Sequence, residues 1–233
     1  MVRRIAITLA ALCLAAPAAS ADTAQTLTRL GGAPCGKGSA FTCVSIQVPL
    51  DHFDAANPSR IRVWFAVRPA TGRSDGILAI ATGGPGSSGI LSADAYLGSY
   101  SAEVLRHRDV VFFDQRGIGR SGGNTCPDAV NAYRLSDASV EEASGVFARA
   151  CVAELRSPGL LPYVGTDQAV EDLAAFRRIL DEPMILYGES YGTQYAQTYA
   201  AAHPEHLQGV IIDRKSTRLN SSHSSVSRMP SSA

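Results

Sequence analysis

The sequence lacks any excess of charge of one sign, because Lys and Arg total 21, Asp and Glu total 21, and the formal net charge is zero. This balance gives no indication of nucleic-acid binding. We find no internal repeat of the kind that repeat architectures require. The apolar run at residues 5–16 is too short to span a bilayer comfortably, so no stable membrane anchor is expected. A hydrophobic content of 45% and a charged content of 18% indicate one domain with a core. Nothing in the sequence predicts the oligomeric state.

The first 21 residues have the pattern of an export signal. Arg3 and Arg4 precede the apolar run, and the small residues Ala19, Ser20 and Ala21 follow it as a cleavage site. The alternative is a buried N-terminal helix. We expect residues 1–21, with Cys13, to be a signal peptide, and the protein to be secreted or periplasmic.

Four cysteines follow this signal: Cys35, Cys43, Cys126 and Cys151. An even number in an exported chain favours two disulfides over four free thiols. Of the three connectivities, we choose the local pairs Cys35–Cys43 and Cys126–Cys151.

The last segment, residues 213–233, changes abruptly in composition and has no apolar periodicity. A disordered linker is one interpretation. However, residues 213–223 and 227–233 can both be translated, in one frame, from a common DNA-sequencing adapter, and residues 224–226 fall where a sample barcode would lie. We therefore interpret the segment as non-native, so that the native chain ends at about residue 212 or 213.

Two kinds of strand are predicted in the remaining chain. Residues 44–48 and 61–67 alternate between apolar and polar side chains and are separated by a turn signal, which favours an antiparallel pair. Short continuous apolar runs, typical of parallel strands buried on both faces, occur at residues 77–81, 110–113, 184–187 and 210–212.

Helical patterns lie between these runs, at residues 139–156 and at residues 167–180 with Thr166 as the N-cap. The order of elements predicts an α/β fold with a mostly parallel sheet flanked by helices.

The segment GESYG at residues 188–192 matches G-x-S-x-G. It follows a buried strand and precedes a helical stretch at residues 193–202, which is the setting of a nucleophile elbow. Gly188 and Gly192 allow the sharp turn that exposes the hydroxyl of Ser190, the predicted nucleophile. The backbone amide of Tyr191 is one expected oxyanion donor.

A second oxyanion donor is expected from the glycine loop at residues 82–86, with Gly84 as the first choice. No Lys-Ser or Lys-Thr pair follows this loop, so a P-loop is not expected. Residues 117–122 match G-x-G-x-x-G, but Asn124, Cys126 and Pro127 follow where a helix should begin, so we do not interpret them as a dinucleotide site. We expect no cofactor and no metal.

Four segments carry a resemblance to a known family: VPLDH at 48–52, GGPGSSG at 83–89, DQRGIGRS at 114–121 and YGESYGTQYA at 187–196. The chain resembles the exported prolyl and tripeptidyl aminopeptidases of the α/β-hydrolase superfamily. The resemblance implies an exported, disulfide-bearing enzyme that cleaves residues from peptide N-termini, often at proline. It also implies a buried ion-pair role for Asp114 and Arg116, behind the active site.

A serine nucleophile needs a general base and an orienting acid, which follow it in the chain order of this fold. Only about 22 native residues follow Ser190. They include His203 and His206, for which we expect surface or helix-capping roles. We assign no role to His52 or His107, and His223 lies in the segment interpreted as non-native.

We therefore interpret residues 22–212 as the N-terminal part of a catalytic domain without its last strands and lid, and the chain itself as inactive. The expected partner of the parent protein is a peptide or small acyl substrate. Two alternatives stay open: a secreted esterase or lipase on the same fold, and a non-catalytic member that only binds.

Overall fold

The computed structural model describes residues 23–213. The predicted signal peptide and residues 214–233 of the predicted non-native segment lie outside the described residues. None of the helices in the described range is long and apolar enough to cross a membrane.

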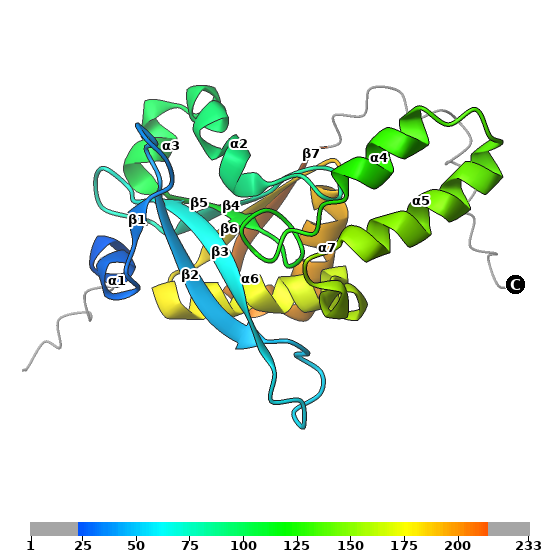
Figure 1. Cartoon of the computed structure of the whole chain (residues 1–233). Coiled ribbons are helices and arrows are strands. Elements are labelled where there is room, and N and C mark those ends of the chain that lie inside the picture. The colour runs from blue at the N-terminus through cyan, green and yellow to red at the C-terminus, as the bar shows by residue number, and fades with distance from the viewer. Residues whose placement is uncertain (1–22, 214–233) are drawn as a thin grey trace, which may run out of the picture.

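The described residues form one mixed sheet whose strand order is β1-β2-β3-β5-β4-β6-β7 (Figure 1). The strands are β1 (Ala33–Pro34), β2 (Thr42–Pro49), β3 (Arg60–Arg68), β4 (Ile77–Ala81), β5 (Asp109–Asp114), β6 (Met184–Glu189) and β7 (Leu207–Asp213). Strands β5, β4, β6 and β7 are parallel, whereas β2 and β3 are antiparallel to their neighbours. The predicted antiparallel pair and the four predicted parallel strands are thus confirmed.

Helices and short 3-10 turns connect the strands. They are α1 (Thr23–Arg29), α2 (Gly89–Tyr96), η1 (Leu97–Ser99), α3 (Ala102–His107), α4 (Pro127–Arg134), α5 (Val140–Glu154), η2 (Pro158–Tyr163), α6 (Thr166–Leu180), α7 (Gly192–Ala202) and η3 (Pro204–His206). The predicted helix at 139–156 corresponds to α5, which begins after Ser139, whose hydroxyl accepts a hydrogen bond from the Glu142 amide.

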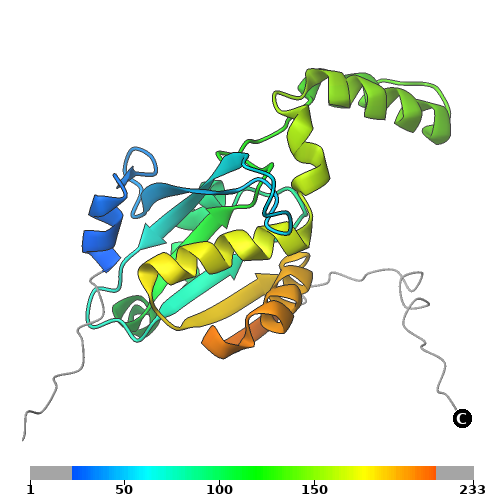
Figure 2. The ribbon, with the colours of Figure 1, turned by 90° about the horizontal axis from the view of Figure 1, so that it is seen from below.

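Two cores lie on opposite faces of the sheet, because successive strand residues point to opposite faces. Ile77, Ala79 and Ala81 of β4 pack toward α6 and α7, which cover one face (Figure 2). Leu78 and Ile80 of the same strand pack toward α2 and α3 on the other face. This explains why β4 reads as a continuous apolar run rather than an alternating one.

Helices α4 and α5 form a hairpin that projects from the body of the molecule in both ribbon views (Figures 1 and 2). A disulfide joins Cys126, the N-cap of α4, to Cys151 in α5. The carboxylate of Glu154 accepts hydrogen bonds from the Asp128 and Ala129 amides, at the N-terminus of α4. The hairpin is therefore tied at its base by a covalent and a polar link.

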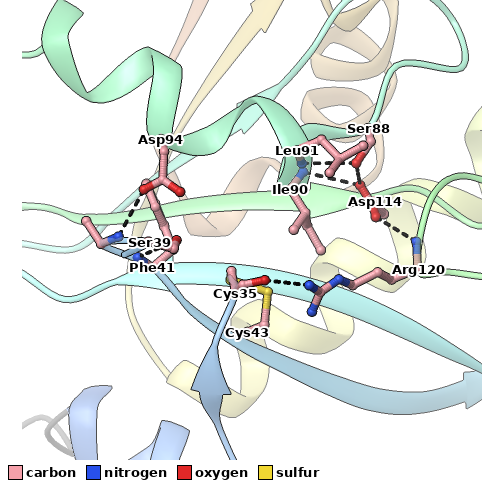
Figure 3. The surroundings of a disulfide bond; sticks show 11 residues. Cys35, Ser39, Phe41, Cys43, Ser88, Ile90, Leu91, Asp94, Asp114 and Arg120 are labelled. Atoms are coloured by element: carbon pink, nitrogen blue, oxygen red, sulfur yellow. Dashed lines mark hydrogen bonds between the residues drawn. A yellow bond between two sulfur atoms is a disulfide. The ribbon is translucent and has the colours of Figure 1, made fainter. Parts of the chain in front are cut away.

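The second disulfide joins Cys35, directly after β1, to Cys43 in β2 (Figure 3). The two bonds together are the pairing chosen from the sequence.

Two local predictions about helix starts are wrong. The N-cap of α6 is Gly165 rather than Thr166, because Thr166 is already helical and its hydroxyl is hydrogen-bonded to the Tyr191 hydroxyl at 2.6 Å. Pro127 does not prevent a helix after residues 117–122 but begins α4, where its missing amide hydrogen costs nothing.

Candidate active site

Ser190 lies in the turn between β6 and α7, at the carboxyl edge of the parallel strands. Its φ of 54° is in the left-handed region, which residues other than glycine rarely adopt. Such strain typically costs about 1–3 kcal/mol and concentrates at functional sites. The residue is also exposed. The turn thus presents a serine in a strained conformation to solvent.

The two glycines of the turn are required by close backbone contacts. A Cβ added to Gly192 would lie 2.0 Å from the carbonyl oxygen of Ala81 in β4, and one added to Gly188 would lie 2.2 Å from the carbonyl oxygen of Gly192. No larger residue fits at either position without moving the strand or the helix. The sequence prediction that Gly188 and Gly192 permit a sharp turn agrees with these contacts.

The backbone of Ser190 is fixed by hydrogen bonds on both sides. Its amide donates to the carbonyl of Asp213 at 3.2 Å, and its own carbonyl accepts from the Thr193 amide at 3.0 Å and the Thr193 hydroxyl at 2.7 Å. Within residues 23–213, the Ser190 hydroxyl has no hydrogen-bond partner. The one group of this residue that is left for chemistry is therefore its side chain.

The glycine loop that follows β4 lies against Ser190. A Cβ built on Gly83 would be 3.1 Å from the Cβ of Ser190 and 3.6 Å from its Oγ. Gly84, the predicted oxyanion donor, comes next and has a φ of 128° before a cis bond to Pro85. Gly83 belongs to the glycine loop predicted at residues 82–86, in which Gly84 was the first choice as donor.

Tyr191 occupies the N-cap position of α7. In the part of the chain that the structure describes, no hydrogen-bond acceptor contacts its amide. An unpaired amide at a helix N-terminus favours negative charge nearby. Tyr191 and the glycine loop thus both adjoin Ser190, as an oxyanion site requires.

No histidine among residues 23–213 contacts Ser190. His203 caps the far end of α7, eleven residues and about 16 Å along the helix axis, and its Nε2 is 2.8 Å from a Glu171 carboxylate oxygen. His206 lies exposed in η3, next to Glu205. The expectation of surface or helix-capping roles for both is confirmed.

The tyrosines beside the elbow do not supply a base either. Tyr96 donates a hydrogen bond to Glu189, and Tyr187 donates one to Asp213 at 2.6 Å. Burial, followed by the hydrogen bond to Glu189, raises the pKa of Tyr96 to about 12. Burial also raises the pKa of Tyr187, with the bond to Asp213 as the next cause. Both phenols stay protonated at neutral pH.

The buried ion-pair role expected for Arg116 is confirmed, with Asp172 as its partner, whereas Asp114 is buried but makes no ion pair within residues 23–213. Arg116 is fully buried and binds Asp172 of α6 through two nitrogens, Nε at 2.8 Å and Nη2 at 2.6 Å. His52 also contacts Asp172 at 2.8 Å through Nε2. Strand β5 ends at Asp114, so the chain turns before Arg116 and directs the guanidinium to α6. The sequence feature that could have identified Asp172 as a buried ion-pair partner is its position, as a carboxylate within the apolar stripe of the predicted helix 167–180.

Asp114 instead holds the start of α2 in place (Figure 3). Its carboxylate accepts hydrogen bonds from the Ser88 hydroxyl, from the Ile90 amide at 3.2 Å and from the Arg120 amide at 2.8 Å. Ser88 is the N-cap of α2 and lies two residues after the glycine loop. Asp114 therefore connects the loop beside Ser190 to the loop after β5.

Comparisons with known proteins agree with this geometry. A family described as alpha/beta hydrolase fold matches residues 77–229. Serine protease Hip1 of Mycobacterium tuberculosis is 32% identical over 200 residues, covering 78% of this chain and 36% of that protein. Tripeptidyl aminopeptidase of Streptomyces coelicolor is 32% identical over 189 residues, covering 73% of this chain and 34% of that protein. Carboxylesterase B of M. tuberculosis is 35% identical over 80 residues, 34% of this chain and 15% of that protein. The chain spans about a third of the length of the first two relatives.

Proposed function

The chain belongs to the α/β-hydrolase fold family, and we propose that Ser190 is the nucleophile of a serine hydrolase that removes residues from peptide N-termini. The observation that carries the proposal is the conformation of Ser190. A non-glycine residue held at a φ of 54° between a parallel strand and a helix, with an exposed hydroxyl, is the arrangement that a nucleophile elbow needs.

In the proposed reaction, the Ser190 oxygen adds to the carbonyl carbon of the scissile bond and its proton passes to a general base. The carbonyl oxygen becomes an oxyanion, which the Tyr191 amide and an amide of the glycine loop stabilise, with Gly84 and the adjacent Gly83 as the loop candidates. Collapse of this intermediate breaks the C–N bond, and the base returns the proton to the leaving amine. Water then hydrolyses the acyl-enzyme by the same route.

The general base and its orienting acid belong, in this proposal, to a later part of the parent protein. The support is geometric, because the histidines of the described range are engaged elsewhere: His52 with Asp172, His203 with Glu171. The 233-residue chain is accordingly expected to be inactive, with a non-native segment from about residue 213. Residues 1–21 are proposed to direct export, which the two disulfides support.

Peptide cleavage is favoured over other acyl transfers by similarity to a serine protease and a tripeptidyl aminopeptidase over most of this chain. Ester cleavage is the second candidate, because a protein named carboxylesterase B shares 35% identity over 80 residues. The elbow and glycine loop serve both reactions equally, so substrates must decide between them.

The test begins with the source DNA, read past codon 213 and expressed as the complete reading frame. Fluorophosphonate labelling and hydrolysis of a tripeptide p-nitroanilide and a p-nitrophenyl ester are measured on this protein, on Ser190→Ala and on Ser136→Ala. Ser136 is exposed at the far end of the α4–α5 hairpin and serves as the matched serine control.

We expect labelling and tripeptide release in the parent and in Ser136→Ala, and neither in Ser190→Ala. Activity on the ester alone would favour the esterase. If the native DNA encodes RKSTRLNSSH and the reading frame then stops, the proposal that the chain is truncated is overturned. A non-catalytic binding protein would then become the better hypothesis.

A further inference from the structure

A cavity of about 680 Å³ lies between the α4–α5 hairpin and the elbow. Its inner side is formed by Pro85 and Gly86 of the glycine loop and by Tyr191. Its outer side is formed by apolar residues of α5 and the segment after it, among them Phe147, Val152 and Leu161. This cavity has no part in the bond-breaking steps above.

We propose that this cavity binds a large apolar side chain of the substrate next to the scissile bond, with the α4–α5 hairpin as its outer wall. The inference rests on the proposed function, because it takes Ser190 as the nucleophile. It adds a substrate preference and a specificity-determining element.

The first argument is continuity with the nucleophile. Tyr191 follows Ser190 directly and lines the cavity. Pro85 and Gly86 belong to the glycine loop and line the cavity. In the same loop, a Cβ built on Gly83 would lie 3.6 Å from the Ser190 Oγ. Both segments that adjoin the nucleophile therefore continue into the cavity wall, which places the cavity next to the residues that would hold the scissile bond.

The second argument is chemistry, because the one charged side chain that lines the cavity, that of Arg116, is already paired, as are Asn124 and the Tyr191 hydroxyl. The guanidinium of Arg116 is saturated by Asp172 and by backbone carbonyls. Asn124 exchanges two hydrogen bonds with the backbone of Ser157, at 3.1 and 3.2 Å. The Tyr191 hydroxyl is bonded to that of Thr166. The cavity thus offers no free charge to an ionic side chain, and the rest of its wall is mostly apolar.

The third argument is size and exposure. Small-molecule sites typically measure about 300–1,000 Å³, so this cavity is larger than a prolyl ring needs. Val152 and Leu161 remain 49% and 40% exposed on its wall. The disulfide and Glu154 hold α5 against α4, so the two helices present this wall as one unit. A large apolar substituent would cover this surface and gain roughly 25 cal/mol per Å² of apolar area removed from water.

The test uses the complete protein with two sets of tetrapeptides, in which the residue before or after the scissile bond is Gly, Pro, Leu, Phe or Glu. The variant is Val152→Asp, which places a charge on the cavity wall. The matched control is Ala153→Asp, the same charge one position further along α5 on an exposed residue that does not line the cavity. Val152→Trp, which fills the cavity without adding charge, is the second variant, and circular dichroism checks that each variant is folded.

In at least one set, the parent should cleave Leu and Phe peptides with kcat/KM about tenfold or more above those with Gly, Pro or Glu. Val152→Asp should abolish this preference. Val152→Trp should lower kcat/KM for the Phe peptides more than for the Gly peptides. Ala153→Asp should leave kcat/KM for all the peptides unchanged. Equal losses for all peptides in Val152→Asp, or a similar loss in Ala153→Asp, would overturn the inference while leaving Ser190 as nucleophile. Cleavage that survives in Ser190→Ala would instead refute the proposed function.

Discussion

Removal of the Asp172 carboxylate should destabilise the protein more than removal of any exposed carboxylate. Asp172 is almost fully buried and accepts two hydrogen bonds from Arg116, at 2.6 and 2.8 Å, and a contact from His52 at 2.8 Å. Asp172→Ala leaves the guanidinium buried without its anion. Breaking one partner of a buried pair typically costs about 3–5 kcal/mol.

The expected loss in the free energy of unfolding is about 3 kcal/mol, at the low end of that range, because the carbonyls of Pro49 and Leu50 still accept from Arg116. The assay is equilibrium urea denaturation, and the matched control is Glu171→Ala. Glu171 is the preceding residue of α6 and pairs with His203 at 2.8 Å near the surface, so its loss should cost about 1 kcal/mol.

The same assay contains the result that would refute this reasoning. If Asp172→Ala and Glu171→Ala lower stability equally, the burial of the Arg116 charge does not matter. A further check is the double variant Arg116→Met with Asp172→Leu. It should recover most of the loss, because replacing a buried ion pair by apolar residues of similar volume is often close to neutral.

Three further predictions concern the elbow and its surroundings. Gly192→Ala should cost about 1–3 kcal/mol in urea denaturation, because its Cβ would lie 2.0 Å from the Ala81 carbonyl oxygen, whereas Gly209→Ala, which meets nothing within 4 Å, should not destabilise. Ser190→Gly should stabilise by about 0.5–1 kcal/mol through relief of the left-handed strain, and a lower urea midpoint would contradict that account. The raised pKa of Tyr96, about 12 against 10.0, means that its neutral form stabilises the fold fully below pH 10 and that this contribution is lost as the pH rises through 12. The thermal denaturation midpoint of Tyr96→Phe should therefore depend less on pH between 10 and 12 than that of the unsubstituted protein. Equal pH dependence would argue against a raised pKa of Tyr96.

The strands and the elbow were predictable because their signals are local. The apolar runs at residues 77–81 and 184–187 are contiguous, and burial on both faces of a parallel sheet demands such runs. The turn around Ser190 is specified by five consecutive residues. A Cβ added to either of their glycines would lie only 2.0 or 2.2 Å from neighbouring backbone. Sequence patterns report contacts of this kind directly.

The interior polar contacts were not predictable because their partners are distant in the chain. Arg116 and Asp172 are separated by 56 residues, and nothing local to Arg116 indicated this partner. The family resemblance implied a buried ion-pair role for both residues, but the end of β5 at Asp114 turns the two side chains to different neighbours. The prediction of Thr166 as a helix N-cap was wrong for a similar reason, because its hydroxyl bonds to the distant Tyr191 hydroxyl instead of capping the helix.

Two of the buried carboxylates, those of Asp114 and Asp172, explain how the loops beside Ser190 are held without the help of the serine itself. Asp114 binds Ser88, two residues after the glycine loop, and Asp172 binds Arg116, whose side chain lines the cavity together with Tyr191. Neither network includes the Ser190 side chain, which has no partner among residues 23–213. The oxyanion donors and the cavity wall are thus positioned by contacts that survive replacement of the nucleophile. Ser190→Ala should therefore remove chemistry while leaving substrate binding intact, and the affinity of the variant for an uncleaved apolar peptide measures the cavity separately from the reaction.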